Sequence, residues 1–290
     1  MKKLFRCFAV ILAVMFLATG IKTEAAAGGG VDWTNGSGMI TATGVGLPPT
    51  NAVGPQKKVW ARTAAIADAQ RRLAEAANEV KVEGETTVKM STLVDDTIRT
   101  SVAATLKGAQ IVSENWNSEG YYEVTMQVPV FGVNGLARAV IPEPTTPPAP
   151  FPAPEVIPSQ GAESQTGDSV SYTSVGGENL ARGGYTGLII DCRGLGLNPV
   201  MSPVIKNSKG VKLYGHENLN YDLVIRDGMA SYANSQSQAS RAGSKPLILK
   251  AERLDDHNAN PVVSVNDGNK ILIENGSSGF LNKTAVVFLY

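Results

Sequence analysis

The chain has 290 residues, and its 26 Lys and Arg residues balance its 26 Asp and Glu residues, so the formal net charge is zero. A chain without a basic excess lacks the field that holds nucleic acid, and no nucleic-acid partner is predicted. Two cysteines are too few for a disulfide framework or a cysteine-ligated zinc module. The 30 glycines and the 6% aromatic content favour β-rich structure with many turns.

Residues 1–27 have the pattern of a secretory signal peptide. Basic residues at positions 2, 3 and 6 precede an apolar run from Phe8 to Ala18, which is too short for a lasting membrane span. The small residues Ala25-Ala26-Ala27 then predict cleavage after Ala27; the alternative is an uncleaved anchor. We therefore predict an exported protein, in the periplasm or cell envelope or secreted, with no integral membrane segment after cleavage.

A proline-rich segment divides the remaining chain. Residues 142–158 hold eight of the 16 prolines, and proline removes backbone donors, so this segment is predicted to join neither helix nor sheet and to act as a semi-rigid spacer. The alternative is a docking ligand for an aromatic groove. The predicted fold class is α+β, with an α+β module over 33–141, a Pro/Ser/Gly-rich linker over 142–183 and a β-rich α+β domain over 184–290.

The first domain is predicted to run β-α-β-α-β-β, with two helices on one face of a mostly antiparallel sheet. The two helices are expected at Lys57–Asn78 and Thr92–Lys107, the second on an i,i+4 row of apolar residues that ends before Gly108. Asp95 and Asp96 are expected to complement the positive end of that second helix. The strands are expected at Met39–Gly46, Val80–Val88, Ala109–Asn117 and Tyr121–Val130.

This pattern resembles the 20-kDa lipoprotein family of bacterial envelopes and the N-terminal domain of the flagellar assembly protein T. The resemblance covers about 100 residues and rests on structural positions: Ala42-Thr43-Gly44-Val45-Gly46, then Ala64, Ala65, Asp68, Ala69 and Leu73, then Leu106–Val112 and Tyr121–Val124. It implies a non-catalytic envelope module, in some cases tied to flagellar or surface assemblies, and supplies no catalytic residues. The chain departs from the lipoprotein pattern because Cys7, preceded by Arg6, is not placed for lipidation.

The second domain is predicted as a set of short strands joined by polar turns. Strands are expected at Gly187–Cys192, Val204–Lys206, Val211–Tyr214, Leu223–Ile225, Leu247–Leu249, Val262–Val265, Ile271–Ile273 and Ala285–Leu289. Turns are expected at 207–210, 266–269 and 275–276, and residues 230–242 are left as a helix or a loop. The segment Arg193–Pro199 resembles a segment of uncharacterised bacterial envelope proteins, to which no chemistry is assigned.

No catalytic set and no cofactor are predicted. The glycine pairs at 44/46 and 194/196 lack the third glycine of a dinucleotide loop and are interpreted as turn glycines. Cys192 is interpreted as a small apolar residue at a strand end, although an outward side chain would leave it reactive. An unrecognised hydrolase would require His216 or His257 close to Cys192 or to a carboxylate.

One weak metal candidate stands out. Asp256, Asn258 and Asn260 occupy positions 1, 3 and 5 of a calcium-loop pattern, and Asp267 falls at position 12. Pro261 replaces the glycine of position 6 and no bidentate Glu is present, so a polar hairpin loop over 255–260 is the preferred interpretation. An extracytoplasmic ligand- or calcium-binding module remains the alternative function.

Four aromatic residues of the first domain, Trp60, Trp116, Tyr121 and Tyr122, are the candidates for a partner surface, although packing in the core and at the sheet edge is the preferred interpretation. The leading hypothesis is a non-catalytic envelope protein that works by binding or assembly, with envelope or surface-assembly proteins as partners. The sequence assigns neither the identity of the partner nor the oligomeric state.

Overall fold

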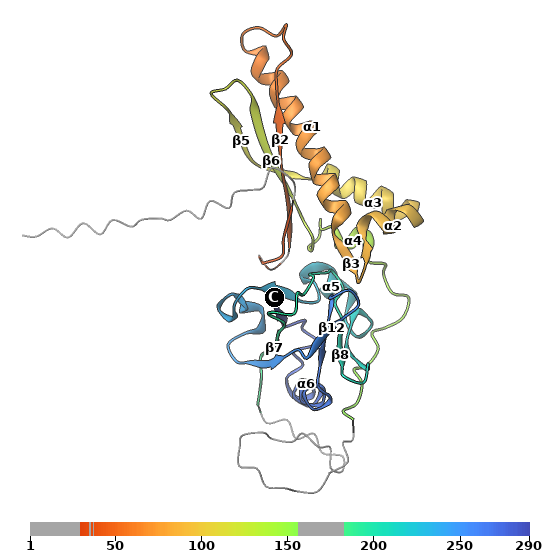
Figure 1. The fold of residues 1–290 in the computed structure, drawn as a ribbon. Helices are drawn as coiled ribbons and strands as arrows, with labels where there is room; N and C mark the ends of the chain where they lie inside the picture. Colours follow the sequence, from red (N-terminus) through yellow and green to blue (C-terminus); the bar gives the residue numbers. More distant parts are fainter. Residues whose placement is uncertain (1–29, 35, 37, 156–182) are drawn as a thin grey trace, which may run out of the picture.

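The structure, a computed structural model, describes residues 30–34, 36, 38–155 and 183–290. The signal-peptide prediction and most of the predicted linker therefore lie outside the described residues. Figure 1 shows two lobes joined end to end, with the helix α1 in the first lobe and α6 in the second. Residues 30–141 are here called the first lobe, 142–155 the strap and 183–290 the second lobe. Both lobes combine helices and sheets, so the predicted α+β class is confirmed.

The first lobe is built on a four-stranded antiparallel sheet in the order β1-β2-β6-β5. Its strands are β1 (Gly30–Asp32), β2 (Met39–Gly46), β5 (Gln110–Trp116) and β6 (Tyr122–Pro129). Along β2, burial alternates with a period of two, which places Ile40 and Ala42 on the buried face. The predicted strands of this sheet and the turn at 117–120 are confirmed to within two residues.

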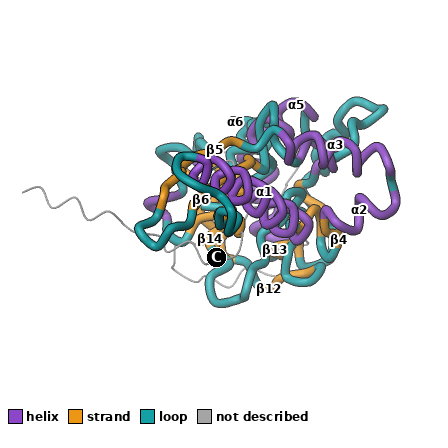
Figure 2. The backbone as a smooth tube through the Cα atoms, turned by 90° about the horizontal axis from the view of Figure 1, so that it is seen from above, coloured by secondary structure: helices purple, strands orange, loops and turns teal. Residues whose placement is uncertain are grey.

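Helix α1 (Gln56–Glu79) lies along the buried face of this sheet, as Figure 2 shows from above. Its buried residues are Ala61, Ala65, Ala69, Leu73, Ala76 and Ala77. A Cβ atom on Gly44 would lie 2.1 Å from the backbone nitrogen of Ala69, so only glycine permits this approach. The turn interpretation of Gly44 and Gly46 was wrong: both lie within β2, where they bring strand and helix backbones together. The other pair, Gly194 and Gly196, has positive φ and does form turns.

The predicted second helix is two helices, α2 (Val88–Val94) and α3 (Asp96–Lys107). The chain is extended at Asp95, whose carboxylate accepts hydrogen bonds from the backbone N–H groups of Thr97 and Ile98 and so begins α3. The helix-end role predicted for Asp95 is confirmed. Val94 lies before the break and is 85% exposed, so the apolar row counted from the sequence begins at Ile98 instead.

The strand predicted at 80–88 is a hairpin of β3 (Lys81–Glu83) and β4 (Thr86–Thr87), turned at Gly84. The prediction was wrong because alternation of apolar residues cannot distinguish one strand from two short strands around a tight turn. The last helix of the first lobe is α4 (Ala137–Val140), which packs against α3.

The second lobe holds a parallel sheet in the order β10-β14-β7-β11. Its strands are β7 (Gly187–Asp191), β10 (Ser231–Ala233), β11 (Pro246–Lys250) and β14 (Val286–Leu289). In β7, Leu188 and Ile190 join the main core whereas Ile189 joins a second buried cluster on the opposite face. A parallel sheet covered on both faces explains why this strand reads as a continuous apolar run.

A second, mixed sheet has the order β12-β13-β8-β9. It contains β8 (Ile205–Asn207), β9 (Lys212–Tyr214), β12 (Arg253–Asp255) and β13 (Asn260–Val263). The predicted hairpin turn at 207–210 is confirmed, since the N–H of Gly210 donates to the carbonyl of Asn207. The predicted loop between β12 and β13 is also confirmed.

Two predicted strands of the second lobe are helical. Leu223–Ile225 lies in α5 (Tyr221–Asp227), which Asn220 caps, and Ile271–Ile273 lies in α6 (Val265–Ser278). The turns predicted at 266–269 and 275–276 also belong to α6. Short apolar runs do not separate strand from helix. Gly268 is a packing residue, because a Cβ atom there would lie 2.9 Å from Leu213.

Residues 230–242, for which the sequence allowed either a helix or a loop, contain no α-helix. After β10 the chain forms two short 3₁₀ turns, Gln236–Gln238 and Ser240–Ala242. A third 3₁₀ turn, His216–Asn218, follows β9. Within the described ranges, none of the helices is both long enough and apolar enough to cross a membrane.

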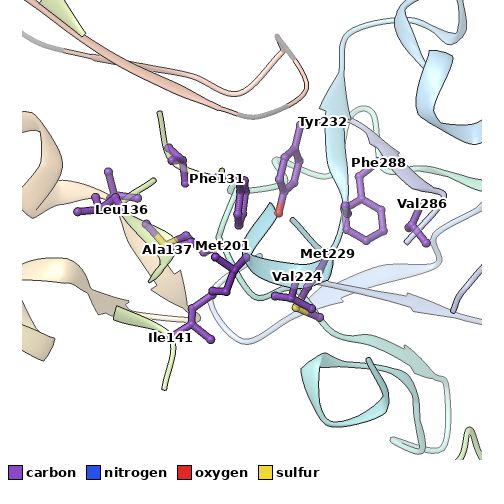
Figure 3. Packing of buried hydrophobic residues seen from close by; sticks show 14 of the residues in the cluster. Phe131, Leu136, Ala137, Ile141, Met201, Val224, Met229, Tyr232, Val286 and Phe288 are labelled. Carbon is purple, nitrogen blue, oxygen red and sulfur yellow. The ribbon is translucent and has the colours of Figure 1, made fainter. Parts of the chain in front are cut away.

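The two lobes share one buried core, which Figure 3 shows from close by. Phe131 of the first lobe packs against Gly228, where a Cβ atom would lie 2.8 Å from the ring. Backbone hydrogen bonds cross the junction as well, from Gly132 to the carbonyl of Ile225 (2.9 Å) and from Met201 to that of Lys81 (3.0 Å). The lobes are therefore packed against each other directly.

The strap follows an irregular extended course and contacts the second lobe from Ala149 onward. Phe151 stacks on Tyr214 with ring centroids 6.4 Å apart and an interplanar angle of 2°. The carboxylate of Glu155 accepts hydrogen bonds from Asn207 and Lys209, at 2.6 Å each, and its backbone exchanges two hydrogen bonds with the side chain of Asn269. These contacts hold residues 149–155 against the fold, where the sequence predicted a spacer, whereas residues 142–148 are exposed. The strap forms neither helix nor strand.

Candidate functional site

The end of the first lobe that points away from the second lobe is the strongest candidate for a functional surface. The β-sheet register places Gly46, Tyr122 and Trp116 at this end, and the loop from β2 to α1 closes it. Figure 1 shows this loop and the start of α1 at the far tip of the molecule. Because the lobe junction lies at the opposite end, nothing in the described part of the chain covers this tip.

Large apolar side chains are exposed there. We call four of them, each more than half exposed, the distal residues: Leu47, Val53, Val59 and Trp60. Exposed single apolar residues are ordinary, but several gathered near one loop and one helix turn are typical of an interaction surface.

Two of the four aromatic candidates of the sequence contact each other at this end. The rings of Trp116 and Tyr122 contact each other at a centroid distance of 6.2 Å, and the ammonium of Lys58 lies 5.7 Å from the ring centroid of Trp116. The hydroxyl of Tyr121 accepts a hydrogen bond from Asn117 (2.7 Å) within the turn. Trp60 is exposed, whereas the other three are half-buried.

Strand β5 forms one edge of the sheet next to this end. It pairs with β6 on one side only, and six of its seven residues are exposed, Ile111 and Val112 among them. An unpaired edge presents backbone N–H and C=O groups that another strand can use. The register shifts between Ile111 and Ser113, and such a bulge restricts which strand can pair there. Sequence reasoning identified the aromatic residues but missed this edge, because exposure on both faces follows only from the strand order.

Ion pairs fix the geometry of α1 near β5. Arg62 of α1 donates to Glu114 of β5 at 2.7 Å, which ties the helix to the edge strand. Partial burial alone would raise the pKa of Asp68, but hydrogen bonds from the N–H of Val45 and from two arginines outweigh it, and this pKa is lowered. The basic residues of α1 are thus partly neutralised by neighbouring carboxylates, as expected for a solvated helix face.

The weak calcium candidate is divided between two structural roles. Asp256, His257 and Asn258 all have positive φ and form the tip of the β12–β13 loop. The carboxylate of Asp256 accepts hydrogen bonds from Lys206 (2.8 Å) and Asn260 (2.6 Å), which lower its pKa. Asp267 instead lies in the first turn of α6, where its carboxylate accepts a hydrogen bond from Ser264. Across the described residues, no group of three His, Cys, Asp or Glu side chains is placed to hold a metal ion.

The residues considered for hydrolysis have separate surroundings. Cys192 is fully buried, and burial, with the nearby charge of Asp191, raises the pKa of its thiol to about 12. Its sulfur is hydrogen-bonded to the carbonyl of Ile190. His257 pairs across the lobe junction with Glu85 at 3.0 Å, and His216 is exposed in a 3₁₀ turn. A buried thiol with a raised pKa is unreactive, so Cys192 packs as an apolar core residue, as the sequence indicated.

A cavity of about 550 Å³ lies between α3 and the segment that leads into α4. Its lining includes Ser101, Thr105 and Val133, with Arg138 as the charged residue. Its volume falls within the range of small-molecule sites.

Comparison with known proteins gives a result for the second lobe. No curated protein matches the chain. The segment 187–290, however, matches the family model described as the second domain of Treponema pallidum Tp0624. This segment covers little more than a third of the chain, and it is the second lobe that is similar to that bacterial domain.

Proposed function

We propose that this protein is an exported, non-catalytic bacterial cell-envelope protein that works by binding and assembly, and that the first lobe carries the binding surface. The observation that carries the proposal is the set of distal residues, exposed beside the unpaired strand β5. Apolar side chains next to a free strand edge suit a protein partner, because the partner gains both buried area and backbone hydrogen bonds.

The second lobe serves in this proposal as the rigid base. Its parallel sheet is covered on both faces and its core continues into the first lobe through Phe131. A surface held by a continuous core loses little entropy on binding, and preorganisation of this kind favours affinity. Similarity of the second lobe to a domain of a Treponema pallidum protein supports a bacterial context.

Export follows from the signal-like residues 1–27 and is part of the proposal. Fractionation of bacteria that express the full chain should find it outside the cytoplasm, and its mature N-terminus should be Gly28. A chain that stays in the cytoplasm with Met1 intact would contradict the envelope assignment. The resemblance of the first lobe to the 20-kDa lipoprotein family supports the same placement.

The binding surface is tested by site-specific photo-crosslinking in intact bacteria. A photoreactive residue placed at Trp60 or at Val112 should give defined adducts with another envelope protein. The matched control is Val133, which is 75% exposed but lies at the end of the first lobe next to the junction. Equal adducts at all three positions, or none at Trp60 and Val112, would contradict the proposal.

A second variant separates binding from folding. Replacing Val53, which is 70% exposed, by Asp should leave the melting temperature within about one degree, since exposed substitutions change stability by roughly 0.5 kcal/mol or less. The same variant should reduce the adducts formed at position 112. Adducts of unchanged yield would remove the distal residues from the surface.

A further inference from the structure

Arg241 of the second lobe is an unusual cation. Its guanidinium is partly buried and makes its hydrogen bonds to neutral oxygens: the carbonyl and the hydroxyl of Thr284, each at 2.7 Å, and the carbonyls of Asp227 (2.6 Å) and Gly228. Burial lowers its pKa, although the negative charge of Asp227 opposes this. Buried charges are ordinarily paired with an opposite charge.

The nearest carboxylate is already occupied. Both oxygens of Asp227 accept hydrogen bonds from Arg226, at 2.9 and 2.6 Å. This bidentate pair satisfies the carboxylate geometrically and, among the residues that the structure describes, leaves the positive charge of Arg241 without a direct anionic partner.

A cavity opens beside this guanidinium. Its volume is about 420 Å³, and its lining includes Arg226, Asp227, Ser240, Arg241, Lys283 and Thr284. Three cations and one carboxylate give the lining an excess of positive charge. The volume is that of a small-molecule site, larger than a lone inorganic ion requires.

The backbone at this place is strained. Thr284 is fully buried and has φ of 51°, a conformation that β-branched residues rarely adopt. Arg241 holds this residue through both its hydroxyl and its carbonyl. Strained residues persist where the surrounding contacts over-determine them, and they cluster at ligand sites.

We propose that the cavity beside Arg241 binds a small molecule through an oxyanion group, a phosphate or a carboxylate. Arg241 supplies a positive charge that four of its five N–H groups hold in place, which leaves one N–H group for a ligand, and the exposed ammonium of Lys283 supplies a second cation. The hydroxyl-bearing Ser240 lines the same cavity. Planar guanidinium groups are suited to both phosphate and carboxylate oxygens, so the two sources share one recognition chemistry.

Binding here is coupled to the lobe junction. The carbonyl of Gly228 bonds to Arg241, and the same residue packs against Phe131 of the first lobe. A ligand that binds the folded state alone raises its stability by mass action. Oxyanions should therefore raise the melting temperature of the whole chain, with no change expected at the distal residues.

Calorimetry of the full chain tests the proposal, with inorganic phosphate and succinate as separate probes. Lys283→Gln should weaken binding about tenfold, the usual effect of losing one charged hydrogen bond. Arg241→Lys keeps the charge but loses the hydrogen bonds that fix its position beside the cavity, and should weaken binding at least as much. The matched control is Lys89→Gln, which removes an exposed lysine of the first lobe.

The test does not depend on Arg241→Lys, which could fail to fold, because Lys283 is exposed and its ammonium donates a hydrogen bond to a backbone carbonyl, that of Ser278. Saturable binding of either probe that weakens in Lys283→Gln and persists in Lys89→Gln supports the site, and the preferred probe identifies the source of the oxyanion. Absence of saturable binding by both probes overturns it, as does binding that Lys283→Gln leaves unchanged.

Discussion

The two lobes differ in how many faces of their main sheet are covered. The first lobe covers one face of an antiparallel sheet with α1 and leaves β5 as an open edge. The second lobe encloses a parallel sheet on both faces with buried apolar side chains. An antiparallel sheet tolerates one solvated face, whereas parallel sheets are found buried on both. This difference is the reason why we propose a binding surface on the first lobe and a rigid base in the second.

Removing the side chain that joins the lobes should have the largest effect. Phe131→Ala deletes a buried ring at the junction and should lower the free energy of unfolding by about 3–5 kcal/mol. Because the lobes would lose their shared core, thermal unfolding should change from one transition to two. Calorimetric scanning measures both effects. Val133→Ala, at an exposed neighbouring position, is the control and should remain near wild type; a single unshifted transition in Phe131→Ala would contradict the shared core.

A change inside the first lobe should act on that lobe alone. Gly44→Val places a side chain where α1 approaches β2 and should cost about 3 kcal/mol or more, because backbone atoms cannot move aside. Hydrogen exchange should show lost protection in the first lobe and retained protection in β7 and β14. Gly108→Ala is the control, since a Cβ atom there would make an ordinary 3.4 Å contact. Equal tolerance of both substitutions would disprove the close packing.

Acid should loosen the strap on the second lobe. Hydrogen bonds from Lys209 and Asn207 lower the pKa of Glu155, so its contribution to stability is present above the ordinary glutamate pKa of about 4.3 and is lost as the pH falls through the lower folded value. Glu155→Gln should therefore melt below wild type at neutral pH, and the difference should shrink in acid. Glu119→Gln matches the charge change on an exposed turn. A pH-independent gap would rule out this explanation.

The smallest effect is expected at Cys192. With its pKa raised to about 12 by burial, this thiol should react with alkylating reagents only through transient unfolding. A Cys7→Ser background leaves it as the single thiol. Mass spectrometry should find slow labelling at neutral pH that accelerates in denaturant. Fast labelling in the native state would reopen the question of a reactive cysteine.

The sequence predicted an element correctly where residues within that element indicate its structure. The alanine-rich periodicity of α1, the capping carboxylate of Asp95 and the turn at 207–210 act within a few residues, so the sequence predicts them. The candidate aromatics Trp60 and Trp116 were also found this way, because aromatic side chains are recognisable without a fold.

For apolar runs shorter than one helical turn, the sequence alone did not separate strand from helix. Ile271–Ile273 and Leu223–Ile225 read as strands, yet both are helical because Ser264 and Asn220 cap helices that begin several residues earlier. The Ser264 and Asp267 pair at a spacing of three was the available signal. It was missed because the following Gly268 and Asn269 read as a turn.

The sequence by itself determined the α+β class and the strands β2, β5 and β6 of the first sheet, and it favoured a buried Cys192, because these depend on patterning within each segment. Only the tertiary structure decided that Gly44 permits helix contact, that the strap lies against Tyr214 and Asn207, and that Arg241 faces a cavity without a direct carboxylate partner. Each of these depends on which distant segments meet. Contact between residues far apart in the chain is not encoded in the spacing of either one.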